Sequence, residues 1–136
     1  MTRATWTLLI AATLLMLIVS AAPLAAHHSF SAEFDVNKPF KLTGVVTKVA
    51  WANPHTFFYV DVTDDKTGKV ANWSMEMGNP NALMRAGWTR NTMKVGDTVS
   101  IEGSLARDGS AYGNARVVIL VATGQRLFAG SSQGQP

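Results

Sequence analysis

The sequence contains no cysteine and little charge. Without cysteine, no disulfide contributes to stability, which must come from packing, and no lipid can be attached to a thiol near the N-terminus. Charged residues make up 15% of the chain, and the formal net charge is +3. This mild excess argues against a nucleic-acid partner. A phosphate-binding loop and a dinucleotide fingerprint are also missing, and Ser29 and Ser74 have no obvious base–acid partners for nucleophilic catalysis.

The first 26 residues have the pattern of an export signal. Arg3 is the only charge ahead of an apolar run at 8–19, and small residues follow as far as Ala26. We predict cleavage after Ala26, so that the mature protein begins at His27 and is periplasmic or secreted. The alternative is an uncleaved anchor, because residues 4–26 are long enough to span a bilayer. Contact with a membrane is expected only in that case.

The remaining chain predicts one small domain. Residues 27–39 show no clean periodicity and are expected to form an extended arm, with Phe30 and Phe34 as anchors. Residues 40–128 are expected to form a single β domain. The small and polar residues 129–136 predict a disordered tail.

Alternating residues in this domain predict five strands, with a short helix between the third and the fourth. We expect Asn79 to cap the helix, Pro80 to begin it and Gly87 to end it. This order of elements is that of the OB-fold, a small five-stranded barrel. The predicted fold is therefore all-β with one short helix, OB-like. The expected strands cover 40–51, 55–63, 69–77, 98–102 and 115–121.

Short motifs are spread over nearly the whole mature chain. They are HHSF at 27–30, EFD at 33–35, WANPH at 51–55, NW at 72–73, PNAL at 80–83, GW at 87–88 and GD at 96–97. With them, the chain resembles a family of small exported bacterial proteins that is catalogued as a domain of unknown function. The resemblance implies export and a single small β domain. It implies no activity, cofactor or catalytic residue.

The three histidines, His27, His28 and His55, are the candidate metal ligands. Cleavage after Ala26 would let the amine and ring of His27 chelate one ion, with a third nitrogen from His28 or His55. Such nitrogen-rich sites suit Cu(II). Cleavage after Ala25 would place His28 third, where the amine, two backbone amides and its ring form a square-planar Cu(II) or Ni(II) site. The alternative is that the pair only begins a polar arm and that His55 caps a strand or bonds a loop.

A second copper hypothesis rests on Trp73, Met75 and Met77. These residues share one face of the third strand, and thioethers favour Cu(I). Register argues against a site there, because methionines on an apolar face usually fill a core. We predict that the core takes these three side chains together with Phe58, Val60 and Val62.

Successive residues of a strand point to opposite sides, so the residues between these core positions form an outer face. This face consists of His55, Phe57, Tyr59, Ser74 and Glu76. OB-folds bind ligands over this region. The alternative function is therefore a non-metal interaction module for a protein or small ligand. If the phenylalanines of the arm cover these aromatics, they would also carry the histidine pair toward His55. Overall, the sequence predicts an exported binding protein that is not an enzyme.

Overall fold

The computed structural model describes residues 30–130, which form six strands and two short helices. The predicted leader and most of the predicted tail lie outside these residues. No helix within 30–130 is long and apolar enough to cross a membrane. The helices are α2 (Phe30–Glu33) and α3 (Pro80–Arg85), and the strands are β1 (Phe34–Ala50), β2 (Phe57–Thr63), β3 (Val70–Glu76), β4 (Thr98–Ala106), β5 (Tyr112–Leu120) and β6 (Gln125–Phe128).

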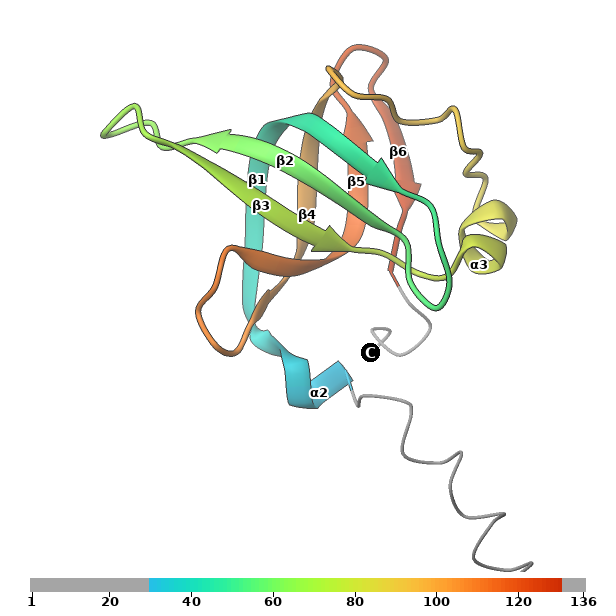
Figure 1. The fold of residues 1–136 in the computed structure, drawn as a ribbon, viewed down its shortest axis with the longest axis horizontal. Coiled ribbons are helices and arrows are strands. Elements are labelled where there is room, and N and C mark those ends of the chain that lie inside the picture. The colour runs from blue at the N-terminus through green and yellow to red at the C-terminus, as the bar shows by residue number, and fades with distance from the viewer. Residues whose placement is uncertain (1–29, 131–136) are drawn as a thin grey trace, which may run out of the picture.

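The first five strands form a ring (Figure 1). β1 pairs antiparallel with β2 and with β4, β2 pairs with β3, and β4 pairs with β5. A short parallel ladder between β3 and β5 joins the two ends of the sheet. α3 follows β3 and precedes β4, so the order along the chain is the predicted OB-like order. The prediction of an all-β fold with one short helix between the third and fourth strands is confirmed.

The long strand β1 serves both halves of the ring. Its first part pairs with β4 and its last part with β2, and both partners meet it around Gly44 and Val45. A Cβ atom at Gly44 would lie 2.6 Å from the carbonyl oxygen of Asp61. Glycine is therefore needed where the neighbouring strand approaches so closely.

Several elements differ from the sequence-based expectation. β1 begins at Phe34, inside the predicted arm, and Phe34 and Asp35 pair with β4 before an irregularity that ends at Pro39. Because this irregularity interrupts the pairing, the sequence lacks a two-residue period there. β5 begins at Tyr112 instead of at Ala115. α2 and β6 were not predicted, since four residues are too few to show a period.

The core follows the predicted parity. Phe58, Val60, Met75 and Met77 are fully buried inside the ring, whereas Val62 and Trp73 are half-buried against the core. The methionine side chains thus fill the core of the domain, as register predicted.

The predicted helix caps are also present. The side-chain oxygen of Asn79 accepts a hydrogen bond from the backbone N–H of Ala82 at 2.9 Å, and Pro80 begins α3. Gly87 has a φ of 93°, a left-handed conformation that favours glycine at a helix end. Beyond it, the indole N–H of Trp88 donates to the carbonyl of Phe128 at 2.8 Å. This bond fastens the end of β6 to the domain.

Two methionines of different burial test the core. Met75 is 0% exposed and Met84, on α3, is 53% exposed. Met75→Ala should lower the free energy of unfolding by about 2–5 kcal/mol, because it removes buried apolar atoms and leaves a cavity. Met84→Ala should change it by less than about 0.5 kcal/mol. Denaturant unfolding of both variants measures the difference, and equal effects would contradict the described core.

Candidate functional site

Strand register places the predicted outer face on one side of β2 and β3. Phe57 lies opposite Glu76 and Tyr59 lies opposite Ser74, while His55 lies two residues before the start of β2. The structure therefore brings these five residues together. The prediction placed Glu76 on an outer face, but in the structure this residue is buried and only 7% exposed.

His55 is held against Glu76 at the end of the loop between β1 and β2. Its Nδ1 lies 3.1 Å from Oε1 of Glu76 and 3.3 Å from the carbonyl oxygen of Met77. The base of this loop is fixed by two backbone bonds, from Thr56 N to the oxygen of Gly78 and from Met77 N to the oxygen of Thr56. Because both neighbours of Nδ1 are acceptors, Nδ1 carries a proton. In the neutral ring, Nε2 then keeps its lone pair.

Tyr112 meets the same carboxylate from the other side. Its hydroxyl donates to Oε2 of Glu76 at 2.5 Å and lies 3.1 Å from Oε1 of Glu33. Burial raises the pKa of Tyr112 above its ordinary value, and the carboxylates of Glu76 and Glu33 raise it further. The phenol therefore stays protonated and remains a donor. Both oxygens of Glu76 have a donor, one from His55 and one from Tyr112.

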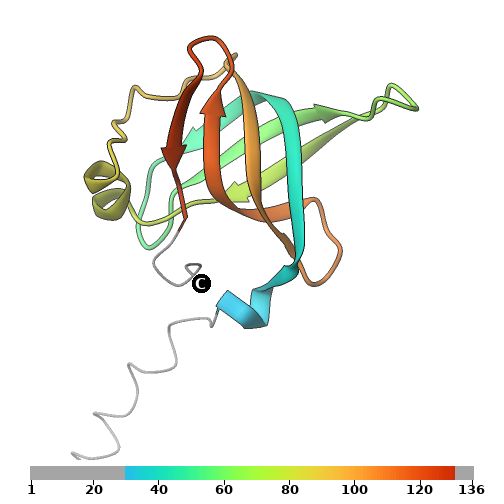
Figure 2. The ribbon, with the colours of Figure 1, turned by 180° about the vertical axis from the view of Figure 1, so that it is seen from behind.

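The start of the described chain packs onto this site. The ring centroids of Phe34 and Tyr112 are 5.0 Å apart, and those of Phe30 and Phe34 are 5.2 Å apart. Arg107, in the turn between β4 and β5, donates through its backbone N–H to Glu33 O at 2.9 Å and through Nε to Ser31 O at 2.7 Å. Figures 1 and 2 show α2 beside this turn at the lower end of the ring. The phenylalanines of the predicted arm thus lie on the aromatic side of the site.

Two further polar residues near this end of β2 and β3 are buried. Asn114 pairs in register with Glu76, and it is buried, as is Thr56. Neither Nδ2 of Asn114 nor Oγ1 of Thr56 has a hydrogen-bond partner within residues 30–130. Unpaired buried polar atoms are uncommon and costly. Together with Glu76, these are the buried polar residues of the described chain; Asn114 lies beside Glu76, whereas Thr56 has the parity of the core residue Phe58.

The structure describes one of the three metal ligands predicted from the sequence. His27 and His28 lie outside the described residues. His55 lies inside, and its side chain is 35% exposed. Within 30–130, no group of three or more His, Cys, Asp or Glu side chains is placed to hold a metal ion.

Sequence reasoning missed Tyr112 and Glu33 as site residues. Tyr112 precedes the expected fifth strand, and only the parallel pairing of β5 with β3 brings it beside Glu76. No local pattern signals such a pairing. The only cue for Glu33 was its place in the motif EFD.

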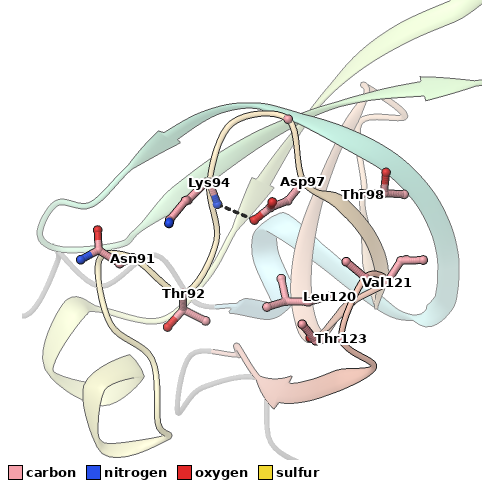
Figure 3. Close-up of a pocket in the computed structure, with 10 residues that line it drawn as sticks. Asn91, Thr92, Lys94, Asp97, Thr98, Leu120, Val121 and Thr123 are labelled. Atoms are coloured by element: carbon pink, nitrogen blue, oxygen red, sulfur yellow. Dashed lines mark hydrogen bonds between the residues drawn. The ribbon is translucent and has the colours of Figure 1, made fainter.

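The structure also contains a pocket at the end of the ring away from α2 (Figure 3). It has a volume of about 460 Å³ and lies between the loop before β4 and the turn after β5. Its charged residues are Lys94 and Asp97, and the carboxylate of Asp97 accepts a bond from the backbone N–H of Lys94 at 2.8 Å. None of the predicted site residues that lie within 30–130 lines this pocket.

Comparison with known families identifies the chain. A family model, Family of unknown function (DUF6152), matches residues 14–115, so the chain belongs to this family. No curated protein matches the chain, and no solved structure matches it.

The raised pKa of Tyr112 predicts a loss of stability at alkaline pH. The unfolded chain releases the phenolic proton near pH 10, whereas the folded protein keeps it. The contribution of the protonated phenol to the free energy of unfolding is thus fully present below pH 10. It falls as the pH rises above 10, by up to about 1.4 kcal/mol per pH unit. Denaturant unfolding should show this extra loss in the wild type but not in Tyr112→Phe.

Ultraviolet absorbance gives a direct check on the same group. The chain has two tyrosines, so Tyr112 is the only phenol in a Tyr59→Phe variant. Its ionisation in the folded protein should occur above pH 10. A midpoint at or below that value would show that Tyr112 does not keep its proton.

Proposed function

We propose that this protein is an exported, non-enzymatic binding protein that holds a copper-type metal ion through His55 and the histidines of its mature N-terminus. The observation that carries the proposal is the contact of 3.1 Å between Nδ1 of His55 and Oε1 of Glu76. Histidines that bind metals usually donate the other ring N–H to a carboxylate or a carbonyl, which fixes the tautomer and the ring orientation. His55 has both kinds of acceptor at Nδ1, so Nε2 is the atom available to a metal.

The other ligands come from the segment that precedes α2. Cleavage after Ala26 would give a first residue, His27, whose amine and ring bind one ion together. His28 is two residues before Phe30, so their Cα atoms are at most about 7.6 Å apart. Phe30 and Phe34 belong to the aromatic stack on Tyr112, and Tyr112 bonds the carboxylate that holds His55. A set of imidazole and amine nitrogens suits Cu(II).

The alternative is a non-metal interaction module that uses Phe57 and Tyr59. The contacts of these aromatics favour the metal proposal. The ring of Phe57 stacks on Tyr112 at 6.5 Å, and Lys48 lies over the ring of Tyr59 at 5.2 Å. Phe57 is thus engaged within the domain, which leaves less aromatic surface for a partner.

Copper titration with variants tests the proposal. The protein is purified from the periplasm, its N-terminus is fixed by mass spectrometry, and Cu(II) is titrated against a competing chelator. We expect one equivalent to bind, and the double variant His27→Ala/His28→Ala to lose this binding. His55→Ala should weaken it by at least about tenfold. Ser74→Ala, on the same face, is the matched control and should bind like the wild type.

The N-terminus provides a second test, because chelation by the amine depends on correct processing. One extra residue ahead of His27 should weaken binding even though all three histidines remain. If the wild type binds no more tightly than the double variant, the metal proposal is wrong. Partner capture with Phe57→Ala and Tyr59→Ala variants would then test the interaction module.

A further inference from the structure

We infer that the pocket at the end of the ring away from α2 binds a small zwitterion with an apolar side chain, the chemistry of a free amino acid or a short peptide. The pocket lies between the loop before β4 and the turn after β5, and its volume is about 460 Å³ (Figure 3). Pockets that hold small molecules usually have volumes of about 300–1,000 Å³. None of the lining residues is proposed to bind copper, so the two proposals are independent.

The pocket contains one side chain of each charge. Its charged residues are Lys94 and Asp97, which stand three positions apart on the same loop. A ligand with only negative charge would be repelled by the carboxylate of Asp97, and a simple cation would be repelled by the ammonium group of Lys94. A ligand that carries a carboxylate for Lys94 and an amine for Asp97 is complementary to both groups.

Both charged groups are available to a ligand. Within residues 30–130, the ammonium group of Lys94 has no ion pair or hydrogen bond, and Asp97 has no ion pair. Oδ2 of Asp97 accepts a hydrogen bond from the backbone N–H of Lys94 at 2.8 Å. Oδ1 of Asp97 has no partner within these residues, so it can accept a hydrogen bond from the amine of a ligand.

Backbone hydrogen bonds hold the charged loop in place before any ligand binds. Val46 N donates to Asp97 O at 2.9 Å, and Gly96 N donates to Val46 O at 2.8 Å. The loop is thus bonded to β1 in both directions. A loop fixed in this way loses little conformational freedom on binding, which favours affinity.

Exposed apolar side chains gather around the same pocket. Val121 lines it and is 51% exposed, and Val95, in the charged loop, is 67% exposed. Val45 is 44% exposed and pairs in register with Thr98, another lining residue. Three of the six exposed large hydrophobic residues within 30–130 are therefore found in or beside the lining. Gathered apolar side chains mark a binding surface, whereas scattered ones do not.

The remaining lining suits a peptide group. Asn91, Thr98 and Thr123 contribute uncharged side chains that both donate and accept hydrogen bonds. A short peptide presents an N–H and a carbonyl between its charged ends, and these need such partners when they leave water.

The first test is an NMR titration of metal-free, isotope-labelled protein with the dipeptide alanyl-leucine. The backbone amide signals of Lys94, Asp97 and Val121 should shift and saturate. N-acetyl-alanyl-leucine lacks the charged amine, and alanyl-leucine amide lacks the carboxylate. Each should bind about tenfold more weakly, because each loses a hydrogen bond to a charged group. Free leucine separates the two sources of the ligand: equal affinity assigns the site to amino acids, and weaker binding assigns it to peptides.

The second test links each end of the ligand to one residue by conservative variants. Lys94→Gln should weaken alanyl-leucine about tenfold but leave the affinity for alanyl-leucine amide unchanged. Asp97→Asn keeps an oxygen that can accept the bond from Lys94 N–H. It should weaken alanyl-leucine but not its N-acetylated form. Lys69→Gln, which removes an exposed lysine just before β3, is the matched control and should bind like the wild type.

The inference is overturned if alanyl-leucine causes no saturable shift at the pocket, or if either capped peptide binds as tightly as the uncapped one. It is also overturned if Lys94→Gln and Asp97→Asn leave the affinity for alanyl-leucine unchanged. The capped peptides are compared on the wild-type protein, so their result holds even if a variant fails to fold.

Discussion

The parallel ladder between β3 and β5 is the interaction on which the rest of the structure depends. Its three residue pairs join the ends of the antiparallel sheet, and they place Tyr112 and Asn114 next to Ser74 and Glu76. The ladder also requires a small residue between them. A Cβ atom at Gly113 would lie 2.7 Å from the ring of Phe40. The closure of the fold and the assembly of the site are thus the same event, and a chain that failed to close would also separate Tyr112 from Glu76.

A buried carboxylate gives the site its order. An ionised glutamate that is withdrawn from water is costly unless donors replace the lost hydration. Glu76 receives donors on both oxygens, from His55 on one side and Tyr112 on the other. The three groups come from different parts of the chain, so each orientation depends on the other two.

Much of the fold was visible in the sequence because its strands alternate. The alternation of Phe58 and Val60 with Phe57 and Tyr59 separated the core from the outer face correctly, and Asn79 marked the start of α3. The site was visible only in part. Parity grouped His55 with Glu76, but it could not show that Glu76 is buried or that Tyr112 lies beside it. Those facts depend on a parallel pairing between strands far apart in sequence and on a helix of four residues, neither of which leaves a local period.

The curvature of β1 has a consequence for any group attached ahead of it. Its 17 residues would span roughly 55 Å if straight, yet its first residue, Phe34, and Phe57, the partner of its last residue, both pack on Tyr112. The strand thus curves so that its first residue and the partner of its last residue contact the same ring. The start of the described chain is therefore held on the same aromatic cluster as the beginning of β2.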